Sequence, residues 1–260
     1  MEFLGVEATD DPLRWRLPVS SWITGGVGQL FGGCGLAAAV AVLETVTGKP
    51  AAWATAQFVA NTFPPQVIEL AVTILADGRN FSQARVEGRV DGREVLAVSA
   101  ALGSKRFAHG GRWLTMPDVA PPHRCPVRTP FGPDAAGVSQ RMEQRVVSSD
   151  WGDDVRAPFG VVRVWVRFPD RLAGTVTGLS IGADFLPLAL RAALGRDVFG
   201  ASLDNTIRFV AAAPHEWVLA DLHIEEVSDG VGHGSVTMWS EAGDLLARGS
   251  QTCAVRDLAP

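Results

Sequence analysis

The first half of the chain combines one continuous apolar segment with several segments in which apolar and polar residues alternate. Gly35 to Gly48 is apolar on almost every side until Glu44, which predicts a helix that is buried on most sides. Turn-forming pairs divide the following residues into four predicted strands, at 53–63, 67–75, 80–90 and 95–102. Arg14 to Arg16 predicts one more strand at the edge of the sheet. We therefore expect an antiparallel sheet wrapped around a central helix.

The same order of elements recurs in the second half. An alternating strand is predicted at 161–169, and a helix from Gly182 to Leu194. In that helix Asp184 is a suitable N-cap, and Pro187 is tolerable only in the first turn. Four strands are predicted after it, at 202–212, 217–227, 234–240 and 245–255. Two fused copies of a helix-wrapping sheet predict an α+β protein whose halves join edge to edge as a pseudo-dimer.

The boundaries of the two halves follow from a change in composition between them. Residues 104–158 contain closely spaced prolines and mixed charges, and the alternation is lost. We therefore expect an N-terminal domain at 1–104, a connecting segment at 105–158 and a C-terminal domain at 159–260.

Two segments of the second half carry a polar residue where the matching segment of the first half is apolar. When Gln57-Phe58-Val59-Ala60 is aligned with Arg208-Phe209-Val210-Ala211, Trp53 falls on Asp204. When Leu96-Ala97 is aligned with Leu246-Ala247, Ala101 falls on Gln251. This asymmetry predicts a single chemical site, in the second half, and a dry, blocked pocket at Trp53.

Composition narrows the class of protein. The chain has 260 residues, 47% of them hydrophobic, and a net charge of −5 without a basic cluster, which argues against nucleic acid or an anionic membrane as a partner. The three cysteines are few and odd in number, which argues against a disulfide framework. The start of the sequence lacks the features of a signal peptide. We expect a cytoplasmic protein. The five histidines lack metal-ligand spacing, so we expect no metal and no cofactor.

The chemistry of the candidate residues leaves two interpretations of each. Asp204 lies among apolar residues, where a raised pKa would suit a general base, but it could equally cap the turn after Gly200. Gln251 could hold a water molecule or face outward from a strand. The Gly32-Gly33-Cys34 segment opens the first helix, where backbone N–H groups could stabilise an oxyanion, or the glycines could simply allow close packing.

Several motifs, in this order, resemble those of the acyl-CoA thioesterase II (TesB-like) family: FGGCGLAAAVAVLE, DGRNFSQARVEGRVDGREVLAVSAAL, ASLDNTIRF and LLARGSQTCAVR. The resemblance covers most of the chain outside residues 104–158. It implies a double hotdog fold and the hydrolysis of acyl-CoA thioesters in fatty acid metabolism. No G-x-S-x-G motif of a serine-triad thioesterase is present.

The resemblance also implies a set of catalytic residues. In this family an Asp, a Thr or Ser, and a Gln hold the attacking water, and they match Asp204, Ser228 and Gln251. Asn205 departs from the family's histidine, and Ser228 at a strand end is also typical of a turn. We expect the three side chains to converge on one water near Gly32 and Gly33.

Three functions remain open from the sequence. The first is an acyl-CoA thioesterase that binds its acyl-CoA substrate as a homo-oligomer. The second is a catalytically weak acyl-CoA-binding protein of the same fold, which the departures from the family pattern at Asn205 and at 227–233 favour. The third is a hotdog hydratase, although the histidine-aspartate motif of that class is absent.

Overall fold

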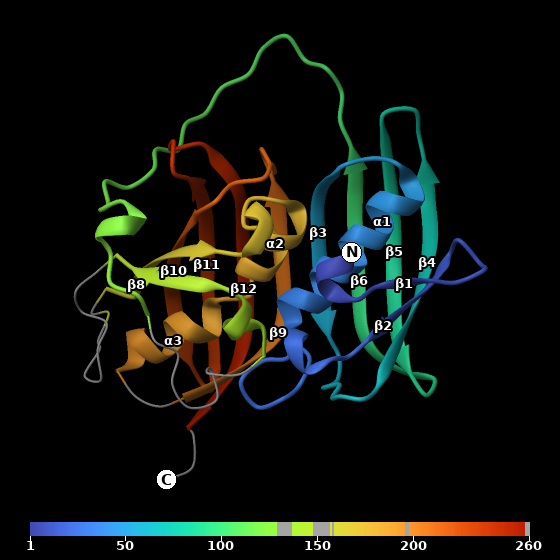
Figure 1. Cartoon of the computed structure of the whole chain (residues 1–260), viewed down its shortest axis with the longest axis horizontal. Coiled ribbons are helices and arrows are strands. Elements are labelled where there is room, and N and C mark those ends of the chain that lie inside the picture. The colour runs from blue at the N-terminus through green and yellow to red at the C-terminus, as the bar shows by residue number, and fades with distance from the viewer. Residues whose placement is uncertain (129–136, 148–156, 158, 196–197, 258–260) are drawn as a thin grey trace. The chain divides into compact units, whose positions relative to one another are not determined.

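The computed structural model describes residues 1–128, 137–147, 157, 159–195 and 198–257. The chain divides into two compact units (Figure 1). The N-terminal unit comprises residues 1–115 and 130–141, and the C-terminal unit comprises residues 116–129 and 142–260. The described part of the predicted connecting segment is therefore shared between the units and contains a strand, β7 (Glu143–Val146), that the sequence pattern did not predict.

The N-terminal unit is a six-stranded antiparallel sheet with one long helix, α1 (Gly32–Thr47). Its strands lie in the order β1-β2-β4-β5-β6-β3. Their bounds are Glu7–Ala8 for β1, Arg14–Pro18 for β2, Ala51–Phe58 for β3, Val67–Asp77 for β4, Phe81–Val90 for β5 and Arg93–Gly103 for β6. Short 3-10 turns occur at Glu2–Leu4, Ser21–Ile23 and Gly137–Arg141.

Helix α1 is the centre of this unit, as its composition predicts. Every residue from Gly33 to Leu43 is buried, so the helix presents apolar side chains in all directions until Glu44. Gly48 ends it in the left-handed conformation, with φ of 65°, and donates its N–H to the Glu44 carbonyl oxygen at 2.9 Å. The helix begins at Gly32, three residues before the predicted start.

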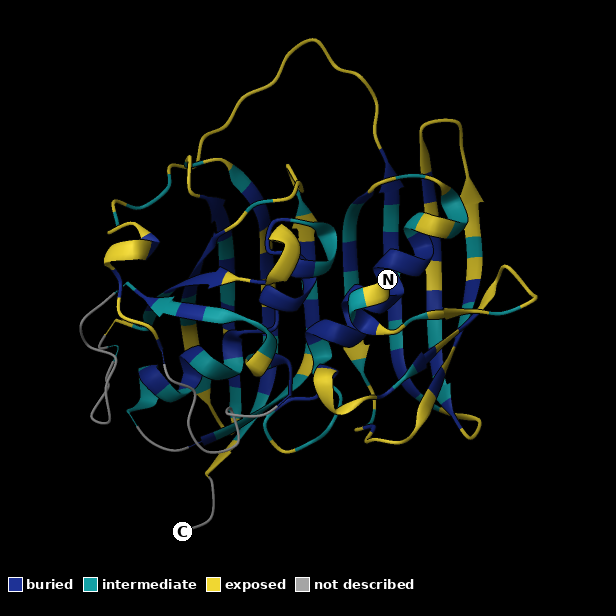
Figure 2. Ribbon diagram, in the orientation of Figure 1, coloured by how far each residue is buried: buried dark blue, intermediate teal, exposed yellow. Residues whose placement is uncertain are grey.

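The alternation along β4 and β5 sorts side chains between the two faces of the sheet (Figure 2). Ile68, Leu70 and Val86 are fully buried, whereas the residues that alternate with the buried ones point outward. These outward residues include Glu69 and Arg89, which are cross-strand partners. The period of two places one face on the core and leaves the other face toward solvent.

The C-terminal unit repeats this topology. Its antiparallel strands lie in the order β9-β12-β11-β10-β8-β7. Their bounds are Val161–Arg167 for β8, Val198–Phe209 for β9, Val218–Ser228 for β10, Val231–Ser240 for β11 and Leu245–Asp257 for β12. Short 3-10 turns lie at Pro122–Arg124 and Pro169–Arg171.

The predicted helix of this unit is two helices, α2 (Val176–Gly182) and α3 (Leu186–Leu194), so the single-helix prediction was wrong. Pro187 has no N–H to donate to the carbonyl four residues earlier, which prevents a continuous helix through it. Pro187 instead lies in the first turn of α3, and the N-cap residue is Phe185 rather than Asp184. Val176–Leu194 is long and apolar enough for a membrane span, but 67% of this window is buried inside the protein.

Residues 116–125 cover part of the outer face of the C-terminal sheet. Trp165, Leu219 and Trp239 form an apolar cluster with Cys125, against which Met116 and Val119 pack. Trp165 donates its Nε1–H to the Ala120 carbonyl at 3.0 Å. Residues 116–125 thus cover the part of the outer face around Trp165, Leu219 and Trp239, whereas Arg248 and Ser250 of β12 stay exposed on that face. Helix α3 packs on the inner face.

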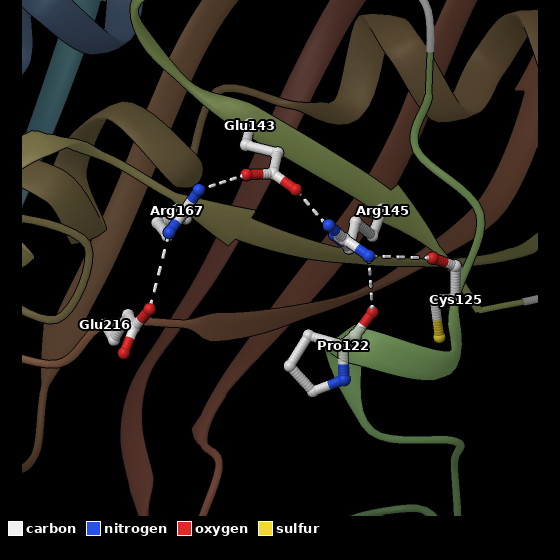
Figure 3. Close-up of polar contacts among 6 residues, drawn as sticks. All are labelled: Pro122, Cys125, Glu143, Arg145, Arg167 and Glu216. Carbon is white, nitrogen blue, oxygen red and sulfur yellow. Dashed lines mark hydrogen bonds and ion pairs between the residues drawn. The ribbon is translucent and has the colours of Figure 1, made fainter.

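An ion-pair network holds β7 to this covering segment (Figure 3). The Glu143 carboxylate accepts hydrogen bonds from Arg167 and, at 2.6 Å, from Arg145. Arg145 also donates to the carbonyls of Pro122 and Cys125, at 3.3 and 3.4 Å. Both guanidinium groups lie over the Trp217 ring, at 5.5 and 5.1 Å from its centre.

Candidate functional site

Each of the two sheets contains a bulge at a corresponding place. The bulge gives a reference point for matching the residues of one sheet with those of the other. In the N-terminal sheet the register shifts between Ala51 and Trp53, and Trp53 pairs with Ala101. In the C-terminal sheet it shifts between Ser202 and Asp204, and Asp204 pairs with Thr252. Trp53 therefore corresponds to Asp204, as the sequence alignment predicted.

The same register also shows which residue of the N-terminal sheet corresponds to Gln251. Gln251 pairs with Asn205, and the matching pair in the N-terminal sheet is Ala100 with Ala54. Ala101 corresponds to Thr252, so the predicted match between Ala101 and Gln251 was wrong by one residue. The bulge is the cause, because the extra residue in β3 and β9 has no counterpart in the strands that pair with them. The asymmetry itself remains: two buried alanines in one sheet replace an asparagine and a glutamine in the other.

Asp204 is half-buried, and its carboxylate is part of the bulge. Its Oδ1 accepts a hydrogen bond from the backbone N–H of Thr252 at 2.7 Å. The carboxylate thereby takes the place of a backbone acceptor where the ladder between β9 and β12 is irregular. This contact brings Asp204 to the peptide bond that directly follows Gln251.

Gln251 lies in a buried polar cluster on the face that α3 covers. Its Nε2 donates to the Asp184 carboxylate and to Ser202 Oγ at 2.7 Å. Ser202 Oγ in turn donates to Asp184 Oδ1 at 2.8 Å. Gln251 and Asp184 are only 4% and 2% exposed, so this cluster lies in the interior of the C-terminal unit.

Two amide groups in this region keep unused hydrogen-bonding capacity. Among the residues that the structure describes, Gln251 Oε1 and both polar atoms of Asn205 are buried without a hydrogen-bond partner. Asn205 is fully buried, and it lies directly across from Gln251 in the sheet. Unpaired buried polar atoms are costly, and they concentrate where proteins bind ligands or water.

The Cys253 side chain borders the same cluster. Burial raises the pKa of its thiol, and the nearby Asp184 and Asp204 carboxylates raise it further, although the contact with Ser202 opposes this. The thiol therefore stays protonated and is a poor nucleophile. Cys34 and Cys125 are likewise buried thiols.

The structure does not bring Ser228 to this cluster. Ser228 is exposed and pairs with Val231 across a tight turn in which Asp229 and Gly230 have positive φ. Gln251 pairs with Gly234, three residues further along β11, a displacement of about 10 Å along the sheet. The hydroxyl that contacts Gln251 is Ser202.

The predicted oxyanion segment opens α1 in the N-terminal unit. The Cys34 N–H donates to the Phe31 carbonyl at 2.9 Å, so this N–H group is already used within the turn. The thiol of Cys34 is completely buried. The roles of Gly32, Gly33 and Cys34 stay predictions.

Sequence reasoning missed Asp184 and Ser202 as members of the cluster. Asp184 was assigned as an N-cap because a short polar residue before a proline-containing helix is typical of one. A more informative signal was available, since Asp184 is a single charge within the apolar segment GADFLPLAL. Across the described residues, no group of three histidines, cysteines or carboxylates could hold a metal ion.

Comparison with known proteins identifies the relatives of this architecture. Residues 19–103 match the family model of the acyl-CoA thioesterase N-terminal domain, and residues 117–255 match that of the acyl-CoA thioesterase C-terminal domain. No curated protein matches the chain.

Solved structures extend the comparison over almost the whole chain. An inferred thioesterase from Novosphingobium aromaticivorans is 32% identical, with a TM-score of 0.85 over 95% of this chain and 97% of its own. A protein of unknown function with a hotdog fold, from Alicyclobacillus acidocaldarius, is 20% identical with a TM-score of 0.83, over 97% and 96%. The acyl-CoA thioesterase II TesB2 from Mycobacterium marinum is 18% identical with a TM-score of 0.79, over 99% and 98%. With its antiparallel sheets, its buried helix and both domain models matched, the chain has the hotdog fold and belongs to the acyl-CoA thioesterase family.

Proposed function

We propose that this protein is a thioesterase that hydrolyses an acyl-CoA thioester to the free acid and CoA. The family membership supports the reaction class. The difference between the two sheets supports a site in the C-terminal unit. Asp204, Asn205 and Gln251 occupy positions at which the N-terminal sheet has Trp53, Ala54 and Ala100.

In the proposed reaction a water molecule attacks the thioester carbonyl carbon. Asp204 accepts a proton from the water as the new carbon–oxygen bond forms. The tetrahedral intermediate then collapses, the carbon–sulfur bond breaks, and the proton passes to the departing CoA thiolate. Gln251 holds the water through its amide oxygen. The backbone N–H groups of Gly32 and Gly33 remain predicted further contributors, whereas Ser228 lies too far along the sheet from Gln251 to share its water.

The proposal includes the organisation of the protein. The two hotdog units would join as the pseudo-dimer of a double hotdog with one active site per chain, and this chain would form a homo-oligomer. We further propose that it acts in the cytoplasm, in fatty acid metabolism, without a cofactor.

The test is a panel of acyl-CoA substrates of different chain length, with release of the CoA thiol as the measurement. We expect turnover by the parent protein and a loss of at least about a hundredfold in Asp204→Asn. Saturable acyl-CoA binding without thiol release would instead support the weak acyl-CoA-binding protein. Loss of the conjugated absorbance of an enoyl-CoA would support a hydratase.

A further inference from the structure

Three polar groups on the inner face of the C-terminal sheet form a closed set of contacts. Gln251 Nε2 is bound by both Asp184 and Ser202, and these two side chains also bind each other. Their residues come from three places in the chain: the turn before α3, strand β9 and strand β12. Two of the three residues are almost fully buried, and Ser202 is half-buried.

This arrangement determines which way the Gln251 amide points. The amide nitrogen is a donor and the carboxylate is only an acceptor, so the nitrogen must face Asp184. The reverse orientation would place the amide oxygen against a carboxylate oxygen in a buried place, where repulsion is strong. Gln251 Oε1 is consequently directed away from Asp184, and it is one of the buried acceptors without a partner among the described residues.

Asn205 adds a second unpaired amide beside it. Side chains of directly opposed residues in an antiparallel pair lie on the same face, with Cβ atoms about 5 Å apart. Asn205 and Gln251 are such a pair. Gln251 Oε1 can accept one proton of a water molecule, and the Asn205 amide N–H can donate to one of its lone pairs. The second proton is then left for a general base, and the second lone pair for attack on the carbonyl carbon. Asp204 pairs with Thr252 rather than with Gln251, and its carboxylate accepts the Thr252 N–H, which belongs to the peptide bond that follows Gln251.

We propose that Asp184 and Ser202 are positioning residues that orient Gln251, so that its Oε1 and the Asn205 amide together bind the water that attacks the thioester. This inference rests on the proposed thioesterase function. It assigns a role to Asn205, and it gives Asp184 an effect on catalysis that acts only through Gln251.

The test compares Asp184→Ala, which removes the acceptor, with Asp184→Asn, which keeps an acceptor oxygen for Gln251 and Ser202. We expect Asp184→Ala and Ser202→Ala to lower kcat by about tenfold to a hundredfold with little change in KM, because a misplaced group affects the reaction more than binding. Asp184→Asn should keep most of the activity. Ser250→Ala, an exposed serine next to Gln251 in β12, should behave as the parent.

A double-mutant cycle separates positioning from a general effect on structure. In a Gln251→Ala background, Asp184→Ala and Ser202→Ala should cause no further loss of kcat. Equal fold losses in the two backgrounds would overturn the proposal. A loss in Asp184→Asn as large as in Asp184→Ala would also overturn it, because the charge itself would then be required. Asn205→Ala should lower kcat by a similar factor, and parent-like kcat in this variant would contradict the role of Asn205.

Hydrogen exchange, which does not depend on enzymatic activity, distinguishes a failure of this proposal from a failure of the proposed function. The side-chain amide protons of Gln251, identified by their loss in Gln251→Ala, should exchange slowly with solvent in the parent and in Asp184→Asn. They should exchange rapidly in Ser202→Ala, which is the variant to use if Asp184→Ala does not fold. An inactive parent with protected amide protons would refute the thioesterase while the orienting contact stands, and rapid exchange in the parent would refute the contact.

Discussion

Trp53 and Asp204 hold the same place in the two sheets, each directly after a one-residue bulge in the first long strand that follows the helical segment. The half-buried indole in one sheet corresponds to a half-buried carboxylate in the other. A tryptophan can fill space but offers only one hydrogen-bond donor, so it cannot accept a proton from water. This pair is the basis of the expectation that the chain has one active site, in the C-terminal unit.

Replacement of Asp204 should separate its chemical role from its structural role. Asp204→Asn keeps an oxygen that can accept the Thr252 N–H, whereas Asp204→Ala loses it. Both variants should lose at least about a hundredfold in thiol release, since both lack a general base. Only Asp204→Ala should also lose stability, by about 1–2 kcal/mol in urea unfolding. Retained hydrolysis in a folded Asp204→Ala protein would exclude Asp204 as the base.

Replacement of Trp53 should affect stability rather than chemistry. The side chain is half-buried, so Trp53→Ala should cost about 1–3 kcal/mol, less than the value for a fully buried indole. The kcat for acyl-CoA hydrolysis should change much less than in Asp204→Ala. An abolished turnover in a folded Trp53→Ala protein, combined with active Asp204→Ala, would place the site in the N-terminal unit.

The buried thiol of Cys253 should make stability fall at alkaline pH. Its pKa in the folded protein is raised above the usual 9.0, while in the unfolded chain the thiol loses its proton near that value. Above about pH 9 the unfolded state therefore binds fewer protons than the folded state, and each such proton lowers stability by about 1.4 kcal/mol per pH unit. Cys253→Ala should remove this contribution, so its free energy of unfolding should fall less steeply above pH 9. Parallel curves for the variant and the parent would contradict the assignment.

The Glu143 network should contribute stability at neutral pH that is lost in acid. Burial alone would raise the pKa of Glu143, but hydrogen bonds from Arg145 and Arg167 outweigh this and lower it below the usual 4.5. The contribution is therefore present above pH 4.5 and disappears as the pH falls through the lowered pKa. Glu143→Gln should cost about 1 kcal/mol in urea unfolding at pH 7 and nothing once the pH is well below 4.5. Glu216→Gln, which alters the more exposed partner of Arg167, is the matched control and should change stability little.

Local patterns in the sequence were sufficient for the long strands of both sheets and for helix α1. An apolar segment from Gly35 to Leu43 can be stable only in the interior, and the alternation in 67–75 and 80–90 requires a sheet with one buried face. These properties depend on near neighbours in the chain, so they are visible without the fold. The strand β7 lacked such a signal, because it has four residues and is held by contacts of Glu143 and Arg145 outside the strand.

The candidate site depended on the tertiary structure. Asp204 and Gln251 could be selected from the sequence because they are polar where the other half is apolar. Only the fold shows that a bulge shifts the register, so that Asn205 rather than Asp204 faces Gln251. Only the fold brings Asp184, 67 residues earlier in the chain, against the Gln251 amide. A sequence pattern reports periods of two or about four residues, whereas strand pairing and the position of a helix on a sheet decide contacts between distant residues.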